Sequence, residues 1–518
     1  MRKLLLMLCV LLLTAAGCTA KPPQEEPPAA EAVTIHAITL GTEPAGGLDN
    51  LYAQLDALTV PELGCRLRFT YIPWGDERNQ LNIAIATGEY DVIPQGNFSD
   101  YQLMASRNAF LDIKPYLAQV PALVEHYRRS GEDVLAAVEI GGKLYGIPQH
   151  QEPGVAASEG FFFREDLRIA WGLEPVTDLA TMEAYLYRAK EEEAFADKPL
   201  ITDNRIWTCL WMILSKDSYF EITSFTDTPY AVCAIDDPYR VVSRVETPEF
   251  RRVLEYVTKW YRDGILDKRL LTLSANEGTS GRVMMLSGDK PCETNSPIWS
   301  IVRDWVPALT EAHPEWELGY YFYNGDGRVM NYKTSSLSGS ALAISSRTKY
   351  PEIAVKLLEK LHTDQRYYDL LNYGVEGEHY YRDEQGVYFD GIPAQMRFPG
   401  WSAAPDTYMD YDNTYRSNST WNEKVYLPYL EQCKAYTEAA QFHPLNRFIF
   451  NVSPVSAQAT ALAEAWNTYM MPLLCGLGED LDAELSEAVA RLKEAGLDAY
   501  LAQMQAQLTA FENNKESE

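Results

Sequence analysis

The stretch from Ser340 to Gly374 constrains the fold more than any other part of this chain. Ser340–Ser345 is a short apolar run that suits a buried strand. Pro351 then marks a helix start, because the first turn of a helix does not use the N–H that proline lacks. Apolar residues follow at helical spacing and give the helix one face that can pack on a sheet: Ile353, Ala354, Leu357, Leu358 and Leu361. A second helix, Asp364–Asn372, ends near Gly374, which favours a left-handed cap. This order predicts an α/β layer.

The N-terminal part shows the same alternation. The pattern predicts strands and helices in turn at Val33–Leu40, Leu48–Leu58, Cys65–Ile72, Glu77–Thr87 and Tyr90–Ile93. Strands that alternate with helices form right-handed parallel crossovers, so this part should be an open α/β lobe.

Polar and aromatic residues follow two of these strands. Ligands of open α/β sheets bind beyond the carboxyl ends of the strands. We therefore predict that Trp74 and Asp76, and then Gln95 and Asn97, lie at a ligand-binding cleft. The alternative is that Trp74 covers the core and Asp76 caps the next helix.

The segment after Gly142 reads as a strand that leads to a crossing between two lobes. Pro148, Pro153 and Gly154 border a short run in which a few backbone dihedrals could absorb lobe closure. Gln149 and Gln151 lie in this run, where they could contact a ligand or satisfy the hinge backbone.

Aromatic residues point to the class of ligand. Sugar rings offer apolar faces that stack on aromatic side chains and hydroxyls that need polar partners. Several aromatic residues lie in or beside polar, turn-rich segments, and these are predicted ligand contacts, with core packing as the alternative: Trp207, Trp211, Trp299, Tyr373, Trp401 and Trp421. An oligosaccharide is the favoured ligand, and a cationic peptide is the other candidate.

The N-terminus has the parts of a secretory signal. Two basic residues precede the apolar run Leu4–Leu13, and small residues lead into Cys18. This end resembles a bacterial lipobox, which implies that residues 1–17 are a lipoprotein signal peptide and that Cys18 is lipidated; ordinary signal cleavage is the alternative. Residues 18–32 are rich in Pro, Glu and Ala and should form a flexible tether.

Charge and composition exclude several classes of protein. The formal net charge is −28, which disfavours nucleic acid and direct contact with an anionic membrane, because both need a basic patch. The widely spaced cysteines form no C-x-x-C and the histidines no metal-binding pair, so we predict no catalytic metal, no other cofactor and mostly free, buried thiols.

Three motifs carry a resemblance to a known family. The strand SALAIS, the helix YPEIAVKLLEKLHTDQ and the turn LLNYGVEGEHY resemble the extracellular solute-binding proteins of ABC importers, of the sugar-type family 1. Phe448–Phe511, with FIFNVSPV and LKEAGLDAYLAQMQAQL, resembles the C-terminal domain of unknown function in a lipoprotein branch of that family.

The resemblance implies an α/β, two-lobed, periplasmic-binding-protein-like (type II) fold with a hinge and a C-terminal helical extension. Together with the predicted crossings, it divides the chain into lobe 1 at 33–150 plus about 290–340, lobe 2 at 151–289 plus about 345–447, and a helical segment at 448–518 packed on a lobe. It also implies a monomer without catalytic activity, lipid-anchored on the outer face of the cell membrane. Such a protein would pass its solute to permease subunits of an ABC importer. A glycoside hydrolase and a surface receptor on the same scaffold are the competing functions.

Overall fold

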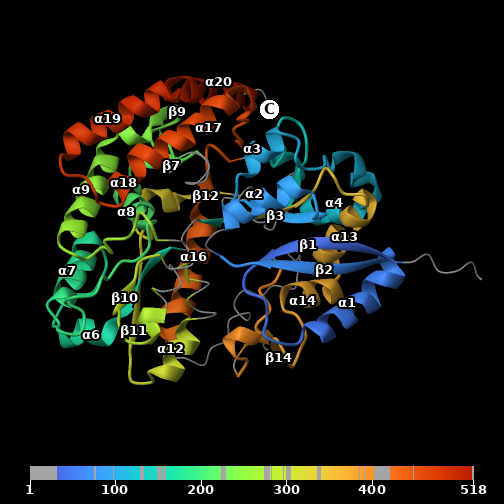
Figure 1. Cartoon of the computed structure of the whole chain (residues 1–518), viewed down its shortest axis with the longest axis horizontal. Helices are drawn as coiled ribbons and strands as arrows, with labels where there is room; N and C mark the ends of the chain where they lie inside the picture. The colour runs from blue at the N-terminus through green and yellow to red at the C-terminus, as the bar shows by residue number, and fades with distance from the viewer. Residues whose placement is uncertain are drawn as a thin grey trace, which may run out of the picture.

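The computed structural model describes residues 32–515, except 75–76, 97, 129–133, 149–153, 156–158, 223–228, 274–280, 282, 296, 299–300, 302–304, 335–339, 384–385, 390, 402–420 and 447. Its elements form two lobes that lie side by side, with β12 and α16 between them (Figure 1). In the described part, no helix is both long enough and apolar enough to cross a membrane.

The first lobe is built on a five-stranded sheet in the order β2-β1-β3-β13-β4. Its strands are β1 (Val33–Leu40), β2 (Cys65–Ile72), β3 (Val92–Gly96), β4 (Gly146–Pro148) and β13 (Ser340–Ile344). β1 is parallel to β2 and β3, whereas β13 inserts antiparallel between β3 and β4. The predicted strands at Val33–Leu40 and Cys65–Ile72 are confirmed, and the predicted Tyr90–Ile93 strand starts two residues later.

Helices cover both faces of this sheet. They are α1 (Leu48–Leu63), α2 (Glu77–Thr87), α3 (Tyr101–Ser106), α4 (Pro121–Arg128), α5 (Val134–Ala137), α13 (Pro351–Thr363) and α14 (Gln365–Asn372). The predicted apolar face of α13 is confirmed, because Ala354, Leu357, Leu358 and Leu361 are fully buried. The Asp364 carboxylate accepts from the backbone N–H of Arg366 and starts α14.

The second lobe contains two antiparallel three-stranded sheets. One has the order β10-β6-β11, from β6 (Gly160–Arg164), β10 (Cys292–Glu293) and β11 (Leu318–Phe322); the other is β7 (Tyr219–Glu221), β8 (Ala231–Ala234) and β9 (Asp237–Ser243). The lobe 2 helices are α6 (Glu165–Ala170), α7 (Leu179–Lys190), α8 (Ile206–Ser215), α9 (Pro248–Arg262) and α12 (Val306–Ala312).

Short strands make the crossings between the lobes. β5 (Gly154–Val155), β12 (Tyr332–Thr334) and β16 (Gln441–Phe442) pair in the order β16-β12-β5, and α16 (Leu427–Ala439) leads into β16. A hairpin of β14 (Tyr381–Asp383) and β15 (Gly386–Tyr388) belongs to lobe 1, where Val387 joins the core.

The strand pairing corrects the predicted division of the chain. We assigned about 290–340 to lobe 1, yet β10 and β11 pair with β6 of lobe 2. We assigned about 345–447 to lobe 2, yet α13 and α14 share the core of α1 and β2 in lobe 1. The physical reason is that β13 returns to lobe 1 and pairs with β3 and β4, which lie far earlier in the chain. No local pattern therefore reveals the partners of β13.

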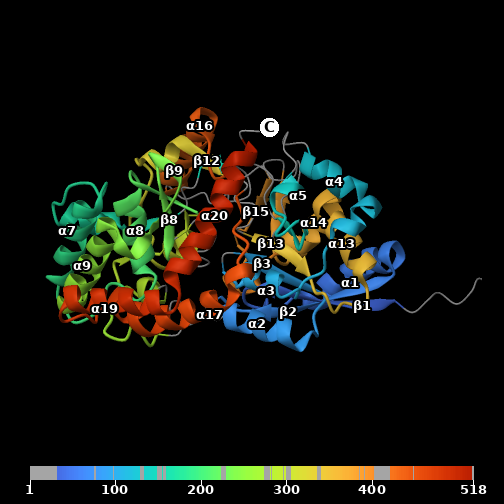
Figure 2. The same cartoon turned by 90° about the horizontal axis from the view of Figure 1, so that it is seen from above.

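The C-terminal helices lie on lobe 2 (Figure 2). They are α17 (Ser456–Ala465), a π-helical turn η8 (Trp466–Met470), α18 (Met471–Leu474), α19 (Leu481–Glu494) and α20 (Leu497–Lys515). Gln505 on α20 fixes the contact with β9, because its Oε1 accepts from Val241 N at 2.8 Å and its Nε2 donates to Tyr239 O at 2.9 Å. Just before these helices, Phe448 and Phe450 pack in the lobe 2 core, whereas Ile449 between them packs on lobe 1.

Candidate functional site: the facing edges of the two lobes

Sheet topology identifies one edge of each lobe as the candidate site. In lobe 1, the parallel strands β2 and β3 end on the same side of the sheet, so Trp74 and the end of β3 lie there. In lobe 2, β10 and β11 run antiparallel to β6. They therefore end where β6 begins, immediately after the chain has crossed from lobe 1. Residues that follow β10 and β11 thus share an edge with Glu159, the residue before β6.

Trp74 presents an aromatic surface at the lobe 1 edge. It is 48% exposed, which is unusual for so large an apolar side chain, and it packs edge-on against Phe98 with ring centroids 5.5 Å apart. Gln95, by contrast, is fully buried, and its Oε1 accepts from Ser99 Oγ at 2.9 Å. Of these two predicted contacts, only Trp74 is open to a ligand in this arrangement of the lobes.

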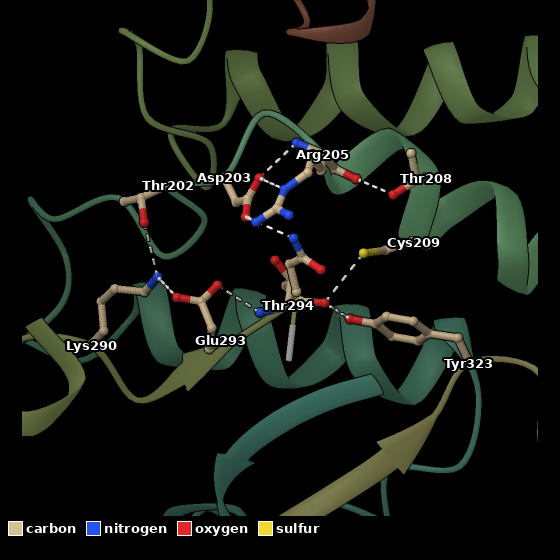
Figure 3. A network of polar contacts seen from close by, with 10 residues as sticks. Thr202, Asp203, Arg205, Thr208, Cys209, Lys290, Glu293, Thr294 and Tyr323 are labelled. Carbon is tan, nitrogen blue, oxygen red and sulfur yellow. Dashed lines mark hydrogen bonds and ion pairs between the residues drawn. The ribbon is translucent and has the colours of Figure 1, made fainter. Parts of the chain in front are cut away.

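A charged pair dominates the lobe 2 edge (Figure 3). The Asp203 carboxylate accepts from Arg205 Nε at 3.1 Å, from Arg205 Nη2 at 2.7 Å and from Asn295 Nδ2 at 2.9 Å. Burial by itself raises the pKa of Asp203, but the Arg205 guanidinium and these hydrogen bonds outweigh burial and hold that pKa below its usual range. Asp203 therefore stays ionised, and it orients an Arg205 side chain that is 64% exposed.

A buried polar network holds this edge in place. Cys209 Sγ, on α8, and the Tyr323 hydroxyl, after β11, both donate to the carbonyl oxygen of Thr294. Glu293 accepts from Thr294 N at 2.9 Å and from Lys290 Nζ at 3.0 Å, and Lys290 is fully buried. Two distant chain segments thus converge on the loop that carries Thr294 (Figure 3), so the position of Asn295 is fixed by the tertiary structure.

Glu159 completes the lobe 2 edge. Its backbone oxygen accepts from Tyr323 N at 3.3 Å, which ties the start of β6 to the end of β11. Its Oε2 is buried and has no hydrogen-bond partner among the described residues. Burial raises the pKa of Glu159 to about 7, Arg205 lowers it and Asp203 raises it further. At neutral pH this carboxyl group can therefore donate as well as accept.

Most of the other predicted aromatic contacts lie in the core. Trp211 on α8 is 1% exposed, and its Nε1 donates to Glu221 Oε1 at 2.7 Å. Trp401 is 2% exposed and donates to Ile38 O at 2.8 Å. Trp207, Tyr373 and Trp421 are also buried, against Trp466, Tyr380 and Phe162 respectively. This burial favours the packing alternative for these five residues.

Several predicted positions lie outside the described residues: Cys18, Asp76, Asn97, Gln149, Gln151 and Trp299. The cysteines of the described part are free, and all are buried except Cys433, which is half-buried. Among the described residues, no group of His, Cys, Asp and Glu could hold a metal ion.

Sequence reasoning missed the polar residues of the lobe 2 edge: Glu159, Asp203, Arg205 and Asn295. Asp203 and Arg205 come shortly after the buried pair Leu200–Ile201, so a polar turn after a short apolar run is the available signal. The sequence-based prediction for this segment names only its tryptophans, Trp207 and Trp211.

Two lobes that are joined by short crossing strands have the architecture of a hinged binding protein. The sequence profile of the bacterial extracellular solute-binding protein family matches residues 58–375, and that of a domain of unknown function (DUF3502) matches residues 444–513. The chain belongs to this family of bacterial extracellular solute-binding proteins, as its motifs predicted.

Known proteins share the fold over nearly the whole chain. A "Carbohydrate ABC transporter substrate-binding protein" of Streptococcus pneumoniae serotype 4 is 23% identical over 92% of this chain and 90% of its own length. The solved N-glycan transport solute binding protein (NgtS) of S. pneumoniae in complex with Man5GlcNAc has 20% identity and a TM-score of 0.68, over 93% of this chain and 99% of the other. The alginate-binding protein AlgQ2 has 16% identity and a TM-score of 0.66, over 92% of this chain and 98% of the other. These neighbours confirm the predicted two-lobed type II fold.

Proposed function

We propose that this protein captures an oligosaccharide between its lobes and delivers it to the membrane permease of an ABC importer. One observation supports this proposal most directly: an exposed tryptophan follows β2 at the carboxyl edge of the lobe 1 sheet, and hydrogen-bonding side chains gather at the lobe 2 edge where β6 begins after the crossing. An aromatic face suits the apolar side of a sugar ring, and the polar edge suits its hydroxyls. The relatives named for carbohydrate transport and N-glycan binding support the same ligand class.

Closure between two lobes supplies the transport signal. A ligand shifts the protein toward the closed form only if it contacts both lobes and so binds that form more tightly than the open one. The permease then discriminates the loaded carrier by its shape. Lipidation of Cys18 would keep the carrier beside the permease, because two acyl chains suffice for stable membrane anchoring.

A thermal-shift screen tests the ligand class. The probes are Man5GlcNAc, kestose and a cationic peptide set, applied to the soluble chain that begins after Cys18. A sugar at 100 times its Kd should add about 2.7 kcal/mol of stability, which raises the melting temperature of a lobe of this size by roughly 5–10 °C. A shift with peptides alone overturns the carbohydrate assignment, and release of reducing sugar from a probe overturns the binding-only role.

The matched variants are Trp74→Ala and Tyr469→Ala. Tyr469 is 37% exposed and lies in the C-terminal segment, where its ring contacts the Arg491 guanidinium, so its removal should leave affinity unchanged. Loss of the Trp74 ring should weaken sugar binding by about fivefold or more, which corresponds to about 1 kcal/mol. Equal effects of the two variants contradict a role for Trp74.

A further inference from the structure

Glu159 leaves one polar atom unexplained. Its Oε2 has no solvent contact and no hydrogen-bond partner among the described residues. Buried carboxyl oxygens in native proteins are almost always hydrogen-bonded, since an unmet one costs free energy. The residue as a whole is only partly buried, and it immediately precedes β6, at the edge next to the crossing. Oε2 is covered in this arrangement of the side chains, so a ligand group that arrives at this edge and displaces its cover can supply the missing partner.

The start of β6 keeps Glu159 in place. A side chain on Gly160 would overlap the Tyr320 ring and the carbonyl of Tyr321, so only glycine allows β11 to pack this closely. The hydrogen bond from Tyr323 N to the Glu159 carbonyl fixes the backbone on the other side. Glu159 thus sits on a rigid strand pair, which is the kind of support that a specific contact needs.

The groups around Glu159 are close to neutral as a set. Six titratable groups of the described residues interact electrostatically with Glu159. They are Asp203 and Arg205 in the loop before α8, Cys209 on α8, Tyr320 on β11, Tyr323 just after β11, and Tyr429 on α16. Asp203 and Arg205 compensate each other as an ion pair. Burial raises the pKa of Cys209 and of each tyrosine, so these groups remain uncharged. Glu159 is left as the group whose charge changes near neutral pH.

We propose that Glu159 is a ligand-binding residue of lobe 2, whose Oε2 accepts a hydrogen bond from a neutral hydroxyl or amide of the captured oligosaccharide. Asp203, Arg205 and Asn295 flank this contact and offer further donors and acceptors. The inference rests on the proposed function and names a residue for it. An anionic sugar is disfavoured here, because its carboxylate would meet a second carboxylate at the same edge.

The contact makes capture depend on pH. A hydrogen bond to the carboxylate is stronger than one to the neutral acid, so the bound ligand favours the ionised form. With a free pKa of about 7, affinity is fully present above that value and falls as the pH drops below it. Between pH 8 and pH 6 the Kd should rise by up to about tenfold. At pH 7, where about half of the free molecules carry the proton, binding should release up to about 0.5 proton.

Calorimetric titration with Man5GlcNAc and kestose tests the inference at pH 6, 7 and 8, in buffers of different ionisation enthalpy. Glu159→Gln keeps the size of the side chain and mimics its neutral form. The variant should bind at all three pH values with about the affinity of the wild type at pH 6, and should release no proton. The control is Glu317→Gln, because Glu317 is exposed and precedes β11 at the opposite end of the same sheet; it should titrate like the wild type.

The outcomes separate this inference from the function on which it rests. Sugar binding that is independent of pH, or that takes up a proton, overturns the role of Glu159 and leaves the proposed function standing. The same holds if Glu159→Gln behaves like the wild type. If neither sugar binds the wild-type protein, both proposals fall. If Glu159→Gln melts at a lower temperature than the wild type, the pH profile and proton release of the wild type decide the question instead.

Discussion

Replacement of Trp211 tests whether its role is packing or ligand binding. The side chain is 1% exposed, stacks on Tyr219 with ring centroids 5.8 Å apart, and lies under the Arg244 guanidinium at 4.7 Å. Its Nε1 donates to Glu221, a partly buried carboxylate that also pairs with the fully buried Arg244. Burial raises the pKa of Glu221, while Arg244 and Trp211 oppose that shift. Trp211→Phe keeps most of the ring but removes the N–H from this network.

The expected loss of folding stability in Trp211→Phe is large enough to measure. A hydrogen bond to a charged group contributes about 1.5–3 kcal/mol, and the weaker cation–π contact of Phe adds up to about 1 kcal/mol. A total of about 2–4 kcal/mol lowers the melting temperature of a lobe of this size by roughly 4–16 °C. Differential scanning calorimetry measures the shift, and titration with Man5GlcNAc measures affinity.

Trp74→Phe is the matched variant, since Trp74 is half exposed and, within the described part of the chain, its ring contacts one aromatic side chain, that of Phe98. It should melt within about 1 °C of the wild type, because exposed substitutions usually change stability by less than about 0.5 kcal/mol. The packing interpretation predicts that Trp211→Phe loses stability and keeps its affinity. An unchanged melting temperature together with lost sugar affinity would refute it.

Two further predictions concern the lobe 1 core and the contact between the lobes. Val375 N donates to His379 Nδ1 at 2.9 Å, and burial lowers the pKa of this histidine below 6.5, so its neutral form stabilises the fold. The free energy of unfolding, measured by urea denaturation, should therefore be highest above about pH 6.5 and decline as the pH falls toward 5. The decline should be shallower in His379→Gln, which cannot take up this proton. Ile449 is an apolar contact of the C-terminal segment with lobe 1. Ile449→Ala should therefore remove about 1–2 kcal/mol of stability and speed amide hydrogen exchange in β4. Exchange that is faster only in the C-terminal helices would contradict this role.

The elements of the fold could be predicted because their signals are local. Apolar spacing located α13 and its buried face, and alternation with helices located β1 and β2 at their observed bounds. The polar N-cap at Asp364 and the glycine after α14 also act within a few residues of the chain. For the site, however, only Trp74 among the described predicted contacts is exposed on an edge that faces the crossing.

The remaining errors have one physical source. A tryptophan in a polar, turn-rich segment can be exposed or buried, and Trp401 is buried because it reaches Ile38 of β1, 363 residues away in the sequence. Burial depends on which distant segment packs against a residue, and the residue's neighbours in the chain do not record it.

The sequence by itself determined that this chain is an α/β protein of two lobes with a C-terminal helical extension, and its motifs placed it in the solute-binding family. Only the tertiary structure decided that β13 completes the first lobe and that Glu159, Asp203 and Asn295, from three distant segments, meet at one edge. Periodicity specifies which face of an element is buried, because burial follows the repeat of the helix or strand. It does not specify the partner, because pairing between distant segments is set by the packing of the whole chain.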